Sequence, residues 1–214
     1  PLAFPKLYKE TTLDSSRVTL IKPGLLIDGL GGPPKQGVAV AIKENLVHWI
    51  GPSEEAETNH EIRSLVESAG RDGVLYSPEC TLLPGLIDCH SHTNMPGDGR
   101  TGEEVAQDTD DVRLMRAAQN TALALESGVT TLCDCGSWNS TAFSVKEGIA
   151  LGLVPGPRFM LSGPPLTTTG GHLWYMGGEA DGIDGVRKQV RYLIKRGADI
   201  IKIAASGGST LTSD

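Results

Sequence analysis

Long hydrophobic runs, basic clusters and a secretion signal are all missing from this 214-residue sequence. The longest apolar runs, such as Gly148 to Pro155, fall well short of the roughly 20 residues that a membrane-spanning helix needs. The N-terminus shows no charged segment followed by an apolar one. Lysine and arginine number 19 against 26 acidic residues, which gives a net charge of -7. We therefore expect neither a membrane nor a nucleic-acid partner.

Cysteine is scarce as well, and its placement does not suggest a disulfide framework. The sequence has four cysteines, which lie in or beside apolar runs and form no CxxC pair: Cys80, Cys89, Cys133 and Cys135. This placement favours buried free thiols. Because free thiols are typical of reducing compartments, we predict a cytoplasmic location.

The composition that remains is that of a globular protein, with 39% hydrophobic and 21% charged residues. In residues 1–83, short apolar stretches alternate with turn-forming residues, which predicts a small β region. A hairpin turn is expected at Lys43-Glu44-Asn45, with Asn45 in the left-handed conformation. The predicted strands are Val18 to Ile21, Leu25 to Ile27, Gly37 to Ile42 and Leu46 to Ile50.

Residues 84–214 have a different rhythm, in which apolar strands alternate with amphipathic helices. Units of this kind, repeated about every forty residues, predict parallel strands in about four βα units. Gly128, Gly152 and Gly197 are placed to end the three helices. The predicted strands are Gly85 to Cys89, Val129 to Cys133, Arg158 to Leu161 and Asp199 to Ala204, and the predicted helices are Asp110 to Ser127, Thr141 to Leu151 and Ile183 to Arg196.

The most informative motif is the stretch PGLIDCHSH, in which an apolar strand ends in His90 and His92. Side chains alternate along a strand, so the two imidazoles are expected to point the same way. Two neutral imidazoles at the carboxyl end of a barrel strand are a natural start for a zinc-type site. We therefore interpret both residues as metal ligands, with surface or core histidines as the alternative.

Lys202 is the second candidate, because it lies among β-branched apolar residues in the predicted strand Asp199 to Ala204. Desolvation lowers the pKa of a lysine. A lysine kept partly neutral could take up carbon dioxide, and the resulting carbamate could bridge two divalent metals. The alternative is a lysine whose ammonium group reaches solvent from the end of the strand.

Three carboxylate-bearing or loop segments near these candidates are open to more than one interpretation. Asp88 is expected to be a structural hydrogen-bonding partner rather than a ligand. Asp134 could face the site or could cap the following turn through backbone hydrogen bonds. The loop Thr93 to Thr109 directly follows the histidine strand, where barrel enzymes place segments that contact substrate or cover the site.

Three stretches together resemble the metal-dependent amidohydrolase superfamily: PGLIDCHSH at Pro84 to His92, GVTTLCDCG at Gly128 to Gly136, and RGADIIKIAASGG at Arg196 to Gly208. The segments around Gly170-Gly171-His172 and Gly177 to Gly182 look like the imidazolonepropionase-like and prolidase-like branch. The resemblance covers the chain from about Val18 to its end. It implies the N-terminal half of a TIM-like (β/α)8 barrel, preceded by a small region of the β-sandwich type.

The resemblance also implies a set of roles. His90 and His92 would bind metal, Lys202 would be the bridging carboxylated lysine, and His172 would bind substrate. One or two divalent ions, most naturally zinc, are the implied cofactor. In the family two more histidines and a general-base aspartate follow, but all five histidines of this sequence precede Lys202. We therefore expect only the N-terminal half of the catalytic set here.

Three functional interpretations remain. The first is an amidohydrolase that cleaves an amide or related C–N bond of a small molecule through metal-activated hydroxide. The second is a truncated, non-catalytic fragment or paralogue that keeps part of the metal site. The third is a mononuclear deaminase of the same superfamily, which would not need Lys202.

The expected half barrel has consequences for association. Four βα units leave two open sheet edges, so we expect either homo-oligomers or association through these edges. In the family the small β region is completed by strands from the far C-terminus, so residues 1–83 would form part of a composite β-sandwich.

Overall fold

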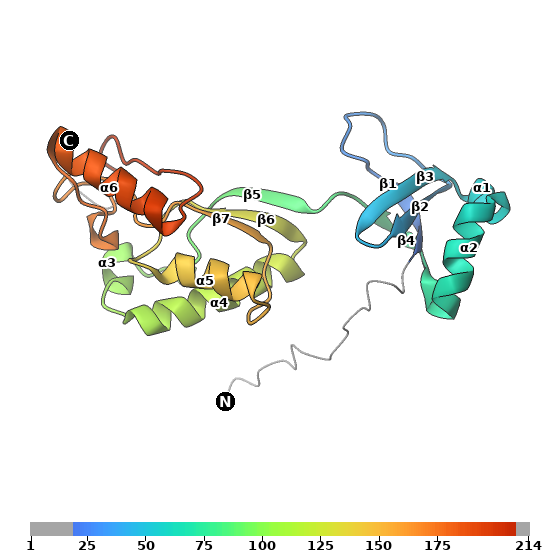
Figure 1. Cartoon of the computed structure of the whole chain (residues 1–214), viewed down its shortest axis with the longest axis horizontal. Helices are drawn as coiled ribbons and strands as arrows, with labels where there is room; N and C mark the ends of the chain where they lie inside the picture. Colours follow the sequence, from blue (N-terminus) through green and yellow to red (C-terminus); the bar gives the residue numbers. More distant parts are fainter. Residues whose placement is uncertain (1–18, 209–214) are drawn as a thin grey trace. The chain divides into compact units, whose positions relative to one another are not determined.

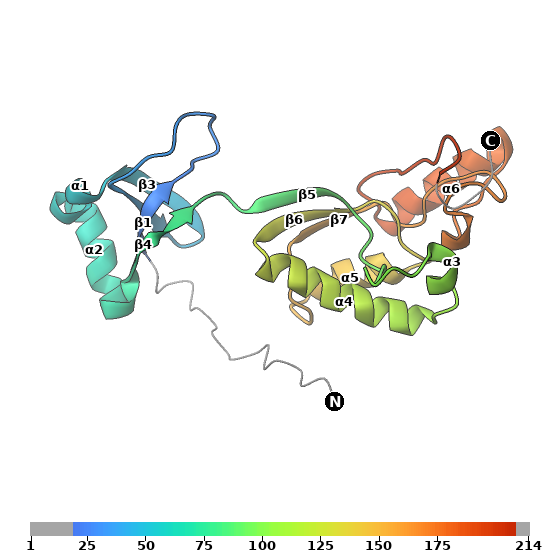
Figure 2. The ribbon, with the colours of Figure 1, turned by 180° about the vertical axis from the view of Figure 1, so that it is seen from behind.

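The structure, a computed structural model, describes residues 19–208. The chain divides into two compact units, Pro1–Pro84 and Gly85–Asp214, each with its own sheet. Figure 1 labels the helices and strands of both units, and Figure 2 shows the same ribbon from behind.

The first unit contains a four-stranded sheet. Its strands are β1 (Leu20–Leu26), β2 (Val38–Lys43), β3 (Leu46–Pro52) and β4 (Val74–Leu82), in the spatial order β3-β2-β1-β4. Strands β1, β2 and β3 are joined in antiparallel pairs, whereas β1 and β4 run parallel. The predicted stretches Val18 to Ile21 and Leu25 to Ile27 correspond to one strand, and Val18 lies outside the described residues.

Two helices that the sequence interpretation missed cover one face of this sheet. They are α1 (Ser53–Thr58) and α2 (His60–Ala69), followed by the short helix η1 (Gly70–Gly73). Ala56 and Ile62 from the helices pack against Ala39 and Ala41, which share a sheet face because they are two residues apart. The Asn59 side chain caps α2 by accepting hydrogen bonds from the backbone N–H groups of its second and third residues.

The hairpin between β2 and β3 corrects one prediction. Lys43 pairs with Leu46, so the loop has only two residues, and its first residue takes the left-handed conformation. That residue is Glu44, with φ of 58°, and not Asn45. The favoured two-residue hairpin loops require positive φ at their first residue. The pairing of Lys43 with Leu46 makes Glu44 that first residue, so Glu44 adopts the left-handed conformation.

The second unit contains a parallel sheet with the order β5-β6-β7. The strands are β5 (Leu86–Ser91), β6 (Val129–Asp134) and β7 (Arg158–Leu161). The connecting helices α4 (Asp110–Glu126) and α5 (Thr141–Ala150) pack against the same face of this sheet (Figures 1 and 2). The remaining elements are α3 (Gly102–Val105), η2 (Trp174–Met176) and α6 (Gly182–Arg196).

The predicted parallel strands and the three long helices of this unit are confirmed, with each helix end within one residue of its expected position. The helix-ending glycines are confirmed too, because Gly128, Gly152 and Gly197 have φ values of 91°, 70° and 92°. Only glycine adopts this left-handed conformation without a steric cost.

The fourth predicted strand, Asp199 to Ala204, is not formed as a strand. Within residues 19–208 the segment makes one isolated parallel bridge, between Ile203 and Leu166. Its start is held at Leu161 by backbone hydrogen bonds from Asp199 N–H, at 2.9 Å, and Ile200 N–H, at 3.4 Å. The Asp199 carboxylate also accepts a hydrogen bond from the Leu161 backbone N–H at 2.9 Å. Asp199 also pairs with Lys146 at 2.7 Å.

The cysteines are free, as predicted, but they are not uniformly buried. Cys135 is buried and Cys133 is half-buried, whereas Cys80 and Cys89 are exposed. Cys80 is on β4 and Cys89 is on β5, and both strands also expose apolar side chains, such as Leu75 and Ile87.

Among residues 19–208, none of the helices combines the length and the apolar character needed to span a bilayer.

Candidate functional site

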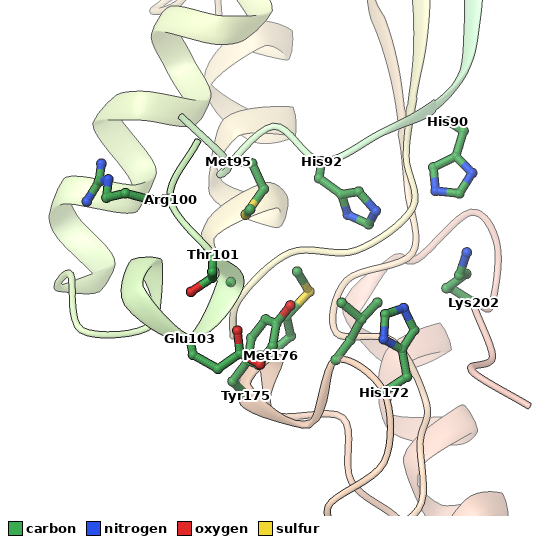
Figure 3. Close-up of a pocket in the computed structure, with 12 residues that line it drawn as sticks. His90, His92, Met95, Arg100, Thr101, Glu103, His172, Tyr175, Met176 and Lys202 are labelled. Atoms are coloured by element: carbon green, nitrogen blue, oxygen red, sulfur yellow. The ribbon is translucent and has the colours of Figure 1, made fainter. Parts of the chain in front are cut away.

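A cavity of about 500 Å³ lies in the second unit, where the loop after β5 meets the segments around η2 and Lys202. A volume of this size is typical of small-molecule sites. Figure 3 shows the side chains that line it. They are His90, His92, Met95, Arg100, Thr101, Gly102, Glu103, His172, Leu173, Tyr175, Met176 and Lys202.

The two histidines of the PGLIDCHSH motif both line this cavity. His90 is on β5 and His92 directly follows it, so the two-residue spacing puts both on one side of the chain. Their ring centroids lie 5.3 Å apart with an interplanar angle of 64°. The convergence that strand alternation predicted is therefore observed (Figure 3).

The His92 ring is held in one orientation by the backbone. Its Nδ1 atom lies 2.9 Å from the carbonyl oxygen of Gly136. A carbonyl oxygen can only accept, so Nδ1 carries the proton, and the Nε2 lone pair is left available for a ligand. Gly136 also makes room for the ring, because a Cβ there would lie 2.9 Å from His92 Cε1 and 2.8 Å from Pro165 Cγ.

Asp134, at the end of β6, holds together the segments that follow β5 and β6. Its fully buried carboxylate accepts hydrogen bonds from the backbone N–H groups of Thr93, at 2.9 Å, and Gly136, at 3.0 Å, and from the Thr93 hydroxyl. These bonds fix the residue after His92 and the residue whose carbonyl holds the His92 ring. Of the two interpretations of Asp134, the structure supports the backbone-capping one.

Burial raises the pKa of Asp134, although the hydrogen bonds from Thr93 and Gly136 oppose this effect. Asp88 has the structural role that the sequence suggested, since it accepts a hydrogen bond from the His90 backbone N–H at 3.0 Å.

The pKa of His90 is lowered, first by partial desolvation and then by the positive charges of Lys202 and His92, while Asp88 opposes the shift. A lowered pKa keeps the imidazole neutral near pH 7. Only the neutral ring has a lone pair that can bind a cation.

Lys202 and His172, far from the motif in sequence, line the same cavity. Both side chains are half-buried, so Lys202 is less enclosed than its apolar neighbours suggested. Lys202 directly precedes Ile203, the residue that makes the single bridge, and the Lys202 backbone carbonyl accepts a hydrogen bond from Leu166 N–H at 2.8 Å. The backbone of Gly208 lies against the His172 ring, because a Cβ at Gly208 would be 2.5 Å from His172 Cε1.

The imidazoles form a partial donor set. Within residues 19–208, no group of three or more histidine, cysteine, aspartate or glutamate side chains is close enough to hold a metal ion. Zinc takes four ligands in tetrahedral sites and at least three from protein in catalytic ones. His90 and His92 fit such an ion as two of its ligands, and further ligands are needed to complete it.

The opposite wall of the cavity was not assigned from the sequence. It is apolar and comes from Met95, Leu173, Tyr175 and Met176. Buried Trp138 stacks on Tyr175 behind this wall, with ring centroids 5.6 Å apart. The loop expected to contact substrate, Thr93 to Thr109, does line the cavity through Met95 and the residues around α3.

One signal for this wall was present in the sequence. Thr101 and Glu104 form a capping box, in which the Thr101 hydroxyl accepts a hydrogen bond from Glu104 N–H and the Glu104 carboxylate accepts one from Thr101 N–H. The Thr-x-x-Glu pattern marks a helix start, so it could have located α3.

Parallel strands joined by helices, with His90 and His92 at the carboxyl end of β5, are the arrangement of β/α-barrel proteins, which hold their functional sites at these ends. Residues 81–213 match the Amidohydrolase family. The chain belongs to this family, as its three motifs predicted.

Two relatives show the extent of the similarity. Ochratoxinase from Aspergillus niger is 30% identical over an alignment of 224 positions, which covers 91% of this chain and 43% of the relative. The crystal structure of A. niger ochratoxinase superposes with a TM-score of 0.74 at 28% identity, covering 92% of this chain and 49% of that one. A Xaa-Pro dipeptidase structure with bound methionine gives a TM-score of 0.72 at 26% identity, covering 89% of this chain and 47% of that one.

The chain therefore spans about half the length of the relatives it matches. The predicted fold, the N-terminal half of an amidohydrolase barrel preceded by a small β region, is confirmed by these comparisons and by the parallel sheet.

Proposed function

We propose that this chain supplies the first half of the active site of a metal-dependent amidohydrolase that cleaves an amide or related C–N bond. The observation that supports this most strongly is the convergence of His90, His92, His172 and Lys202 on one cavity in a chain of this family. In this proposal residues 84–214 form the catalytic half barrel, and residues 1–83 form part of a composite β-sandwich.

The site residues have distinct proposed roles. His90 and His92 bind a divalent ion, most naturally zinc. The lowered pKa of His90 favours its neutral ring, and the Gly136 carbonyl holds the His92 ring through Nδ1 and leaves Nε2 for the ion. When bound, the ion polarises the substrate carbonyl and supplies a nucleophilic water near neutral pH. Lys202, in its neutral form, adds to carbon dioxide and releases one proton, and the carbamate becomes an anionic ligand. His172 donates to or orients the substrate carbonyl.

The substrate class is proposed more broadly. One structural relative is described as a Xaa-Pro dipeptidase and another as a prolidase, which supports a dipeptide or an N-acylated amino acid. The general base and the later ligands would come from sequence beyond this half. The four free cysteines support a reducing, cytoplasmic location.

The test is the metal content of three proteins expressed with zinc and bicarbonate: wild type, His90→Ala/His92→Ala, and the control His48→Ala/His60→Ala. The control removes two histidines of the first unit, one of which pairs with Glu61. We expect near-stoichiometric metal in wild type and control and a loss of most metal in the site variant. Equal, negligible metal in all three would favour a non-catalytic fragment.

Lys202→Ala separates the remaining alternative. A carbamate bridge predicts that this variant loses at least part of its metal and no longer responds to bicarbonate. Unchanged metal content would instead favour a mononuclear deaminase. As an independent readout, nitrogen NMR of the metal-free chain should show His92 protonated on Nδ1.

A further inference from the structure

Glu103 is an unneutralised carboxylate on the wall of the cavity. It belongs to α3, is half-buried and lines the cavity opposite the histidines. In the part of the chain that the structure describes, its carboxylate makes no hydrogen bond and no ion pair. In Figure 3 its side chain extends from α3 toward Tyr175 and Met176.

The other charged side chains of the same loop all have a partner, and the Glu104 carboxylate is engaged by Thr101 N–H in the capping box. Arg100 pairs with Asp98 at 3.0 Å and with Asp108 at 3.3 Å. Asp108 also pairs with Arg116 at 2.7 Å, and this hydrogen bond is the main reason why the pKa of Asp108 is lowered. Arg100 also lines the cavity, but its guanidinium is directed away from the histidines (Figure 3) and shared between two carboxylates. Glu103 is thus the acidic group that remains for a ligand.

Next to Glu103 the wall is apolar and adaptable. Met95 and Met176 have unbranched thioether side chains that adjust to irregular shapes. Tyr175 adds an aromatic ring, supported from behind by Trp138. Aromatic faces attract cations through their electron density, so the ring and the carboxylate favour the same kind of ligand group.

We propose that Glu103 and this wall form a specificity subsite for a cationic group on an apolar stem. The substrate class is an amide whose side chain ends in an ammonium or guanidinium group. The stem lies along Met95, Met176 and Tyr175, and the cation pairs with Glu103. This inference rests on the proposed function for the amide, whereas the cation preference follows from the wall itself.

The test compares two ligands that share a four-carbon stem and differ in the terminal ammonium group, Nα-acetyl-L-lysine amide and Nα-acetyl-L-norleucine amide. Affinities are measured on the full chain from the methyl NMR signals of Met95 and Met176, with exposed Met115 as an internal reference. We expect wild type to bind the lysine compound about tenfold more tightly, a difference of about 1.4 kcal/mol. Glu103→Gln should bind both compounds equally, and the exposed control Glu126→Gln should behave as wild type.

Added salt should reduce the preference in wild type and leave Glu103→Gln unchanged, because salt screens an ion pair that is only half-buried. Equal binding of both ligands by wild type would overturn the proposal, and so would a preference that survives in Glu103→Gln. Circular dichroism establishes that each variant is folded.

Failure of this inference is distinguishable from failure of the proposed function. Histidine-dependent metal content with no charge preference would remove only the subsite. A Glu103-dependent preference in a chain that holds no metal would support the subsite and remove the metal-dependent activity.

Discussion

The two units of this chain bury different kinds of side chain. Of the ten buried polar or charged residues in the described part of the chain, nine lie in the second unit and one, Thr19, lies in the first. The first unit is held by a small aliphatic core under α1 and α2. The second unit holds the candidate site, and hydrogen-bonded polar side chains make up much of its interior.

Asn94 illustrates what such a network does. Its fully buried amide donates to the Arg113 carbonyl at 3.0 Å and accepts from Trp138 N–H at 3.2 Å and from the Thr141 hydroxyl at 3.0 Å. It thereby joins the segment after β5 to α4 and to the start of α5. Buried polar groups are costly when unpaired, so a satisfied network specifies one arrangement of these segments. The network gives the site a defined geometry, and it makes the second unit sensitive to substitution of its buried polar residues.

The largest effect is expected for Asn94→Ala. The change leaves the backbone N–H of Trp138 without its buried acceptor and removes two further hydrogen bonds. We expect the free energy of unfolding of the second unit to fall by about 3 kcal/mol. Urea unfolding measures it through tryptophan fluorescence in a Trp49→Phe/Trp174→Phe background, in which only buried Trp138 remains. A loss below about 1 kcal/mol would show that the network does not distinguish the two units.

A smaller effect is expected for the matched change in the first unit, Asn59→Ala. This substitution removes the cap of α2, whose acceptor bonds are 3.0 and 3.3 Å long and lie near the surface. Loss of such a cap costs about 1 kcal/mol. The measurement is urea unfolding followed by circular dichroism, with Asn45→Ala in the hairpin loop as a control that should match wild type. A loss equal to that of Asn94→Ala would break the comparison.

The smallest effect concerns chemistry rather than stability. Burial, followed by the neighbouring Cys135, raises the pKa of the half-buried Cys133 thiol to about 11. At pH 8 only about 0.1% of such a thiol is thiolate, the reactive form. Iodoacetamide should therefore modify exposed Cys80 of the first unit well before Cys133, as peptide mass spectrometry would show. Modification of Cys133 should accelerate as the pH approaches 11, and equal rates at pH 8 would contradict its shifted pKa.

The sequence predicted the half of the site that depends on local periodicity. Alternation along a strand was enough to bring His90 and His92 together, and the family motifs added Lys202 and His172. Helix ends at Gly128 and Gly197 followed from the left-handed conformation that glycine permits. These features depend on neighbours in the chain or on short motifs.

The features that the sequence did not predict depend on long-range partners. Asn94 and Arg113 are polar residues whose burial becomes intelligible only when their partners are known. The segment from Asp199 meets Leu161 through backbone hydrogen bonds and the Asp199 carboxylate, and only Ile203 forms a bridge where the fourth strand was expected. The missed helix α2 was within reach, because Asn59 precedes Ile62, Leu65 and Val66 at helical spacing.

Gly136, the last residue of the motif GVTTLCDCG, packs directly against the ring of His92, the last residue of the motif PGLIDCHSH. The volume that a methyl group would need at residue 136 is already filled by the ring of His92 and by Pro165. Residue 136 therefore cannot gain a side chain while His92 and Pro165 keep their present positions. A descendant of this chain that acquired a side chain at residue 136 would first have to lose the imidazole or shift the proline. A substitution of His92 can therefore occur while Gly136 is retained. A substitution of Gly136 cannot occur first, while His92 and Pro165 remain in place.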